Sequence, residues 1–206
     1  MDNPLRYPGS KADFLTTLHG ILKASGYYGL PIVEPYAGSA SISLGLLEHG
    51  AVPKATLVER DPLLFAFWTC VFEHTERLIN RFLDLPISLT TWKALQPLLA
   101  IKAPSARNLL ELGVAGLFFN RTNFSGIIHS GPIGGMSQSS QYKIDCRTNK
   151  SNIIARIAQI AELHRLVTVK FGDGLEQIKK DAKRTNVFYY VDPPYFIEGE
   201  RLYRHY

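Results

Sequence analysis

The sequence predicts an α/β fold in which a parallel central sheet carries helices on both faces. Short apolar runs that suit strands alternate along the 206 residues with longer segments whose apolar residues recur at helical spacing. Glycine or acidic residues follow several of the strand candidates, at the points where the chain has to turn. A chain of this length supplies one sizeable core with room for a small insertion.

The first half of the chain supplies two strands with their helices. Apolar residues recur at helical spacing from Phe14 to Leu22, and Gly26 suits the end of that helix. Pro62 suits the first turn of a later helix, and Gly50 the end of an earlier one. The elements predicted after the first helix are a strand at 31–35, a helix at 41–49, a strand at 55–59 and a long helix at 62–83.

The second half begins with helices and returns to strands. Between them lies a segment rich in Ser, Gly and Gln with little periodicity, which indicates an inserted loop-and-hairpin unit at 120–149. The other predicted elements are helices at 91–99, 106–119 and 153–163, a strand at 166–171, a helix at 174–182 and a strand at 187–191.

Composition narrows the class of protein. Hydrophobic residues make up 46% and charged residues 20%, as in ordinary globular proteins. The sequence contains no run of 18 apolar residues, so no membrane span is predicted. The first residues lack a secretory signal, which favours the cytoplasm. Cys70 and Cys146 are expected to be reduced, and the six histidines have no metal-site spacing, so no metal is expected.

The net charge of +5 is concentrated in one segment. Between Ala115 and Gln159 a single acid, Asp145, stands among five basic residues, namely Arg121, Lys143, Arg147, Lys150 and Arg156. A solvated loop surface and a phosphate-binding surface explain this charge equally well.

Two residues at strand ends suit a ligand that contains a nucleoside. Gly38 follows the strand at 31–35, and a glycine there lets a ligand approach the backbone closely. Glu59 ends the next strand, 21 positions after Gly38, the spacing at which doubly wound folds place a carboxylate on ribose hydroxyls.

The strongest motif is Asp192-Pro193-Pro194-Tyr195, directly after the last predicted strand. Two prolines remove two backbone donors and stiffen the turn, so that carbonyl oxygens and the carboxylate remain as acceptors. This arrangement suits an exocyclic amino group, whose hydrogens the acceptors bind while the tyrosine stacks on the base.

Together these motifs resemble the Dam-type family of DNA adenine-specific methyltransferases, the S-adenosylmethionine-dependent class with an Asp-Pro-Pro-Tyr motif. The resemblance implies a Rossmann-like methyltransferase fold with an inserted target-recognition region, and transfer of a methyl group to the N6 amino group of a flipped adenine. The matching segments, in the family's order, are Arg6–Lys11, Val33–Ser41, Phe119–Gly126 and Asp192–Tyr195.

The resemblance assigns a role to each matching residue. The catalytic residues would be Asp192, Pro193, Pro194 and Tyr195. The cofactor-binding residues would be Tyr7, Lys11, Tyr36, Ala37, Gly38, Ser39, Glu59, Asp173 and Asp192. Contacts with double-stranded DNA are expected from Arg121, Asn123, Lys143, Arg147 and Lys150.

The same reading divides the chain and leaves one edge of the sheet open. Residues 1–75 and 160–206 would form the cofactor-binding and catalytic domain, and residues 76–159 the target-recognition insertion. In this fold the strand at 187–191 lies beside the first strand, and family members continue with further strands. Those C-terminal strands are missing here. Two explanations stay open: a second copy or a partner chain covers the exposed edge, or the chain is a truncated form.

Three alternative functions stay open. An RNA base methyltransferase would use similar Pro-Pro-Tyr chemistry, and methylation of the cytosine amino group is conceivable, although Ser usually replaces Asp192 there. A truncated, non-catalytic DNA-binding protein or subunit is the third alternative.

Overall fold

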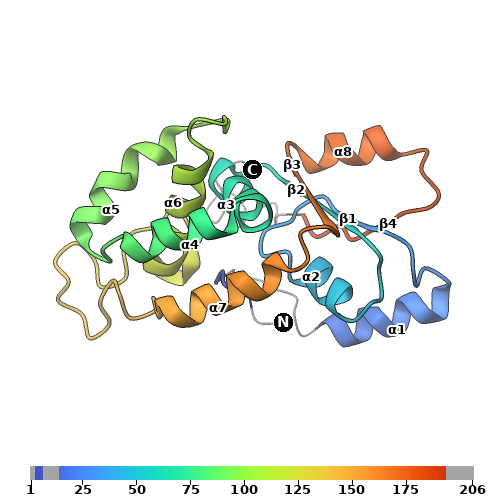
Figure 1. Ribbon diagram of the computed structural model, residues 1–206, viewed down its shortest axis with the longest axis horizontal. Coiled ribbons are helices and arrows are strands. Elements are labelled where there is room, and N and C mark those ends of the chain that lie inside the picture. The colour runs from blue at the N-terminus through green and yellow to red at the C-terminus, as the bar shows by residue number, and fades with distance from the viewer. Residues whose placement is uncertain (1–2, 7–13, 194–206) are drawn as a thin grey trace.

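The computed structural model describes residues 3–6 and 14–193, and their centre is a four-stranded parallel sheet (Figure 1). The strands are β1 (Ile32–Glu34), β2 (Ala55–Glu59), β3 (Val167–Phe171) and β4 (Phe188–Tyr189), in the order β3-β2-β1-β4. The parallel sheet and the position of the fourth strand beside the first are both confirmed.

The register of the strands brings their carboxyl ends to one edge. Ile32 of β1 pairs with Ala55 of β2 and with Phe188 of β4, and Glu59 at the end of β2 pairs with Phe171 at the end of β3. Loops that follow these strands therefore meet at the same side of the molecule, where ligands bind in open α/β sheets.

Helices cover both faces of the sheet. Helices α1 (Leu15–Ser25) and α2 (Ser41–Glu48) lie on one face, and α8 (Gly174–Asp181) lies on the other (Figure 1). Because neighbouring strand residues point to opposite faces, Ile32 packs with the α1 and α2 side chains, whereas Val33 packs with Val58 and Val187.

The remaining helices extend the molecule to one side of the sheet. In Figure 1 α3 lies nearest the sheet and α5 farthest from it. None of the helices in the described part of the chain is long and apolar enough to cross a membrane. These elements are α3 (Pro62–Glu73), α4 (Thr75–Asp84), α5 (Leu89–Leu95), η2 (Gln96–Ala100), α6 (Leu109–Thr122), η3 (Phe124–Gly126) and α7 (Lys150–Ala161).

One continuous core joins this extension to the sheet. Its largest fully buried side chains come from α3, α4 and α6, and it also includes Leu57 of β2. Two glycines of α6 allow the backbone of α3 to come close. A Cβ at Gly116 would lie 2.7 Å from the carbonyl oxygen of Leu63, and one at Gly113 would lie 2.9 Å from that of Ala66. Residues 76–159 therefore pack as an extension of the sheet domain and share its core.

The long helix predicted at 62–83 is wrong, because the chain breaks at His74 into α3 and α4. His74 has φ −139° and ψ 38°, and the hydroxyl of Thr75 donates to the carbonyl oxygen of Val71 at 2.7 Å. Such a side-chain bond to the preceding turn bends helices. The turn lets Leu78 and Phe82 face the core.

Two further expectations are corrected in the insertion. The helix expected at 91–99 ends at Leu95 and continues as the 3₁₀ helix η2, since Pro97 has no N–H for the next helical bond. The expected loop-and-hairpin unit contains, in the described residues, a single antiparallel bridge between Asn123 and Pro132, and α6 extends to Thr122 before it begins.

The fourth strand is shorter than the predicted 187–191 and forms the last strand of the sheet among residues 3–6 and 14–193. Phe188 and Tyr189 are half-buried, and Val191 beyond them is exposed. The predicted edge position of this strand is thus confirmed for the described part of the chain.

Candidate functional site

The loop between β1 and α2 is held in a defined shape from two sides. The N–H of Gly38 donates to Oε2 of Glu59 at 3.0 Å, and the indole Nε1 of Trp68 donates to the carbonyl oxygen of Gly38 at 2.9 Å. Gly38 and Ala40 both have positive φ, 47° and 52°. The spacing between Gly38 and Glu59 thus corresponds to a direct hydrogen bond between the two predicted residues.

Glu34 at the end of β1 completes the support of this loop. The first helical N–H groups of α2 lack a side-chain cap, because the residue at that position is Ala40. Oε2 of Glu34 instead accepts the N–H of Ser43 at 3.2 Å. Burial, together with smaller effects of the nearby carboxyl groups of Asp192 and Glu59, raises the pKa of Glu34 to about 8.

Glu59 is a buried side chain whose carboxyl oxygens are not all occupied by hydrogen bonds within the protein. Its side chain is 8% exposed, and its Oε1 accepts the N–H of Asp61 at 2.8 Å while Oε2 is bonded to Gly38. The pKa of Glu59 is raised to about 7, mainly by burial and in smaller part by the neighbouring Asp61. The backbone of Arg60 donates to this carboxyl group as well. A carboxylate has about four acceptor positions, so these three bonds leave Glu59 one position for a ligand hydroxyl.

Asp173 follows β3 and lies at the same edge. Its Oδ1 caps α8 by accepting the N–H groups of Leu175 and Glu176, and its Oδ2 accepts a bond from Arg60 at 3.1 Å. The carboxylate raises the pKa of Tyr36, whose burial acts in the same direction and contributes more. Gly174 allows the start of α8 to come close to the β1–α2 loop, since a Cβ there would lie 2.3 Å from the carbonyl oxygen of Pro35.

Asp192 and Pro193 follow β4, and Asp192 is half-buried. Its carboxyl group is near enough to raise the pKa of Glu34, which places the catalytic candidate beside the β1–α2 loop. Four of the predicted site residues lie outside the described residues, namely Tyr7, Lys11, Pro194 and Tyr195.

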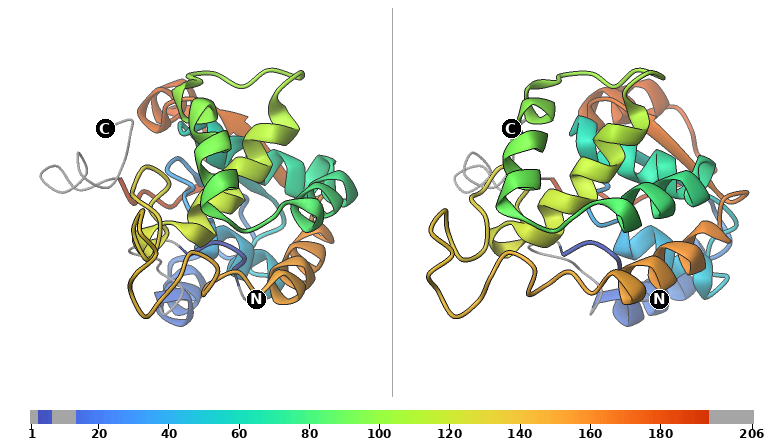
Figure 2. Two further views of the ribbon diagram at one scale, coloured as in Figure 1. Left: turned by 90° about the vertical axis from the view of Figure 1, so that its left-hand side faces the viewer. Right: turned by 60° about the vertical axis from the view of Figure 1, so that its left-hand side comes forward.

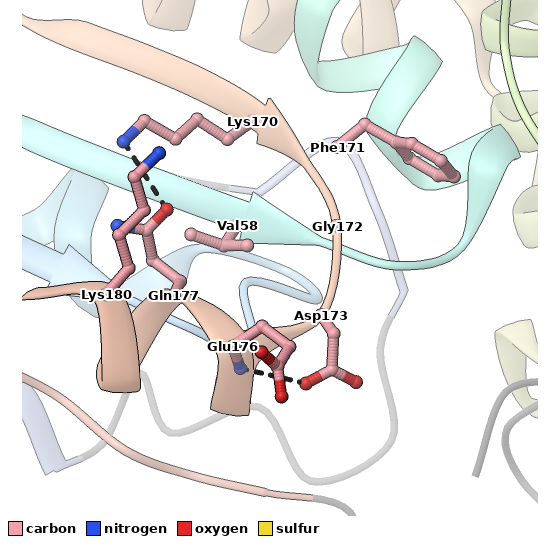
Figure 3. A pocket seen from close by; sticks show the side chains of 8 residues that line it. All are labelled: Val58, Lys170, Phe171, Gly172, Asp173, Glu176, Gln177 and Lys180. Atoms are coloured by element: carbon pink, nitrogen blue, oxygen red, sulfur yellow. Dashed lines mark hydrogen bonds between the residues drawn. The ribbon is translucent and has the colours of Figure 1, made fainter.

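An open cleft of about 430 Å³ lies between β3 and α8 (Figure 3). Asp173 lines one end of it, and Lys170, which bonds to Gln177 at 3.4 Å, lines the other. Of the predicted cofactor-binding residues only Asp173 lines this cleft, so the cleft adjoins the Gly38–Glu59 contact without containing it.

The segment 3–6 is held against both the β1–α2 loop and the end of α6. The Nδ2 of Asn3 donates to the carbonyl oxygen of Ser39 at 2.5 Å, and Leu5 is buried in the core. Asn120 is fully buried and bonds to both backbone groups of Arg6, at 2.7 and 2.6 Å, and to the carbonyl oxygen of Gly126 at 2.9 Å. The Phe-Asn-Arg segment thus fixes the backbone that leads to Tyr7 and Lys11.

Arginine side chains gather beside this segment. The guanidinium of Arg121 donates to the carbonyl oxygens of Arg147 at 2.9 Å and Pro4 at 3.4 Å. The pKa of Arg121 is lowered to about 10, mainly by burial and in smaller part by the like charges of Arg6, Arg156 and Arg147. In the described part of the chain no carboxylate forms a salt bridge with Arg6, Arg121 or Arg147.

The five predicted DNA contacts differ in their surroundings. Arg147 is exposed and lies 5.8 Å from the ring centre of Tyr142, and Arg121 is half-buried. The exposed Lys143 donates to the backbone of Gln138. These three remain accessible to a phosphate.

Asn123 and Lys150 have structural roles instead. Asn123 is fully buried, and its amide group bonds to the indole of Trp92 and to the carbonyl oxygen of Ile128, both at 2.7 Å. The ammonium of Lys150 bonds to the carbonyl oxygens of Leu83 and Leu85, at 2.6 and 2.7 Å, at the end of α4. These contacts indicate structural roles for both residues, and a DNA contact by either of them stays a prediction.

Sequence reasoning missed the supporting residues of the site. Glu34, Asn120 and His129 act through partners far away in the chain, and periodicity contains no signal for such contacts. Asn120 belonged to a matching segment, which could have drawn attention to it. His129 lies 3.3 Å from Asp61 and had no signal in the sequence.

A comparison with protein families matches residues 7–206 to the model described as D12 class N6 adenine-specific DNA methyltransferase. A search of curated proteins finds no match.

Proposed function

The chain belongs to the D12 class N6 adenine-specific DNA methyltransferases, and on that premise we propose that S-adenosylmethionine and a flipped adenine meet at the carboxyl edge of its sheet. The observation that carries this proposal is the contact between Gly38 and Glu59. It joins the two predicted cofactor residues and leaves an acceptor position on a buried carboxylate.

The residues at this edge suit the methyl donor. Glu59 would accept a ribose hydroxyl, and the β1–α2 loop with Tyr36, Ala37, Gly38 and Ser39 would border the methionine part. Asp173 beside Tyr36 would bind the amino group of the cofactor adenine. The resemblance assigns Tyr7 and Lys11 to the methionine end of the cofactor. When bound, S-adenosylmethionine supplies a sulfonium methyl that is already activated for transfer.

Asp192 and Pro193 would prepare the target amino group. Its nitrogen is a weak nucleophile, because the lone pair is delocalised into the adenine ring. Hydrogen bonds from its two hydrogens to the Asp192 carboxylate and the Pro193 carbonyl oxygen favour a pyramidal nitrogen, and Tyr195 would stack on the base. After transfer the nitrogen loses a proton. Positioning of this kind can supply about 7–11 kcal/mol of the acceleration.

The arginines beside segment 3–6 would hold double-stranded DNA. Arg6, Arg121 and Arg147 lie next to the backbone that also contacts the β1–α2 loop, so phosphate contacts and the target pocket share one side of the protein. Flipping the base costs a few kcal/mol, which such phosphate contacts offset. The edge of β4 that has no neighbouring strand among residues 3–6 and 14–193 is the proposed place for a partner chain or second copy. A cytoplasmic location stays a prediction.

A methyl-transfer assay tests this function. Unmethylated duplex DNA, single-stranded DNA and RNA are incubated with S-adenosylmethionine labelled in its methyl group, and the products are digested to nucleosides. We expect label in N6-methyladenine from the duplex. The variant Asp192→Ala is expected to transfer no methyl group, with S-adenosylmethionine affinity changed only modestly, since the residue faces the target base.

Two results would contradict the proposal. Label found only in RNA or in cytosine would reassign the substrate, and normal turnover by Asp192→Ala would remove the catalytic role. Sequencing of the methylated product identifies the recognised site.

A further inference from the structure

His129 makes the contact between the insertion and the cofactor side of the sheet. It lies between α6 and α7, and its Nε2 is 3.3 Å from Oδ2 of Asp61, which directly follows β2. The two side chains are 26% and 14% exposed. A carboxylate is an acceptor only, so the imidazole Nε2 must carry the hydrogen.

Asp61 connects this contact to the predicted cofactor residues. Its backbone N–H donates to Oε1 of Glu59 at 2.8 Å, and its Oδ1 accepts the N–H groups of Leu63 and Leu64 at the start of α3. Although burial raises the pKa of Asp61, the bond and charge of His129 and these N–H donors outweigh it and hold that pKa below its usual value. A continuous series of hydrogen bonds thus leads from His129 through Asp61 and Glu59 to Gly38.

The other end of the series is held by the loop of residues 123–131. Asn123 bonds to the carbonyl oxygen of Ile128, the residue before His129, and the hydroxyl of Ser130 bonds to the carbonyl oxygens of Phe124 and Ile127, both at 3.0 Å. The N–H of Phe124 closes the loop on the carbonyl oxygen of Gly131 at 3.0 Å. The position of the imidazole therefore depends on the whole loop.

The same loop begins beside the arginines. Asn120 at the end of α6 bonds to Gly126 and to Arg6, and Arg121 is the next residue. A phosphate that binds Arg6 or Arg121 consequently acts on the root of the loop whose tip contacts Asp61.

We propose that His129 is a positioning residue that couples DNA binding by the arginines at the root of the 123–131 loop to cofactor binding by Glu59. This inference rests on the proposed function. DNA held by these arginines steadies the loop, strengthens the contact of His129 with Asp61 and so holds Glu59 in place for the ribose. By thermodynamic reciprocity, the cofactor then increases the affinity for DNA by the same factor.

The test measures that factor by calorimetry. S-adenosylhomocysteine, which cannot react, is titrated into the protein with and without a duplex that the wild-type enzyme methylates. We expect wild-type binding to tighten with DNA by a factor in the usual range of about 5–150. In His129→Ala the factor should fall below about 2, whereas binding without DNA changes little.

Conservative variants separate positioning from folding. His129→Gln keeps a side-chain N–H and should restore most of the factor. Asp61→Asn keeps an oxygen for the helix N–H groups but loses the acceptor for His129, and should behave like His129→Ala even if the latter folds poorly. The exposed His164, whose hydrogen bond is local, provides the matched control His164→Ala with the wild-type factor.

The outcomes are distinguishable. A wild-type factor of 1, or a full factor in both His129→Ala and Asp61→Asn, overturns the coupling and leaves the proposed function intact. A wild-type protein that binds no S-adenosylhomocysteine at all overturns both.

Discussion

Burial strongly raises the pKa of the Glu34 carboxyl group. It is 5% exposed and accepts a backbone N–H at the start of α2 in place of a missing cap. The folded protein keeps Glu34 protonated up to a pKa of about 8, while the unfolded chain loses this proton near the ordinary value of 4.5. Stability contributed by the neutral form is therefore complete below about pH 4.5 and is lost as the pH rises towards 8.

Glu34→Gln should remove this loss. The amide oxygen can still accept from Ser43, and no charge has to be buried at high pH. We expect the free energy of unfolding of Glu34→Gln to exceed that of the wild type increasingly from pH 5 to pH 9, by about 1.4 kcal/mol for each pKa unit at most. Urea unfolding across this range measures it. Glu162→Gln at an exposed position controls for the net charge, and parallel curves for Glu34→Gln and wild type would refute the explanation.

Arg147 and Lys150 are both basic residues of one segment, but their contacts predict different roles. Arg147→Ala should weaken duplex binding and reduce the salt slope of log affinity by about 1 for one lost phosphate contact, without changing stability. Lys150→Ala removes the bonds to the end of α4 and should lower stability by about 1 kcal/mol with the salt slope unchanged. Fluorescence anisotropy between low and moderate salt, combined with urea unfolding, separates the two. Exchanged phenotypes would show that the assignment is reversed.

At the scale of elements, the contact between α3 and α6 depends on glycine. The carbonyl oxygen of Leu63 is backbone and cannot turn away from a Cβ at Gly116. Gly116→Ala should therefore destabilise the protein by about 1–3 kcal/mol. Gly20 lies within α1 with nothing within 4 Å of its Cβ position, so Gly20→Ala should stabilise by about 0.5–1 kcal/mol. Thermal and urea unfolding measure both, and a neutral Gly116→Ala would mean that the two helices pack less closely.

The type and order of the elements were predictable wherever the apolar pattern was local. The parallel sheet and the helices at 41–49 and 174–182 follow from periodicity and from the alternation of strands with helices, whereas the position of the fourth strand follows from the family resemblance. The break at His74 was not predictable, because apolar spacing continues through it and the cause is a hydroxyl bond and the direction of the core. The expected hairpin failed because polar, glycine-rich sequence specifies turns more strongly than strand pairing.

At the scale of the whole molecule, three segments from distant parts of the chain meet at one edge. Figure 2 shows segment 3–6, in dark blue, beside the end of α6 and the insertion in yellow-green. Asn120 joins the first to the second, and His129 joins the insertion to β2. Gly38 and Glu59 were found from sequence because each lies where a strand ends, and Asp173 was found through the family resemblance. Glu34, Asn120 and His129 were not, because their partners lie far away in the chain and only the folded arrangement brings them together.

We propose that Glu59 and Gly38 bind S-adenosylmethionine at the carboxyl ends of β1 and β2. Calorimetric titration of S-adenosylmethionine into the wild type and into Glu59→Gln measures this binding. We predict saturable binding of one molecule by the wild type. For Glu59→Gln the affinity should be about 10–100-fold weaker, since an amide replaces a charged acceptor worth roughly 1.5–3 kcal/mol. Wild-type protein without any uptake, or equal affinity in a folded Glu59→Gln, would contradict the account.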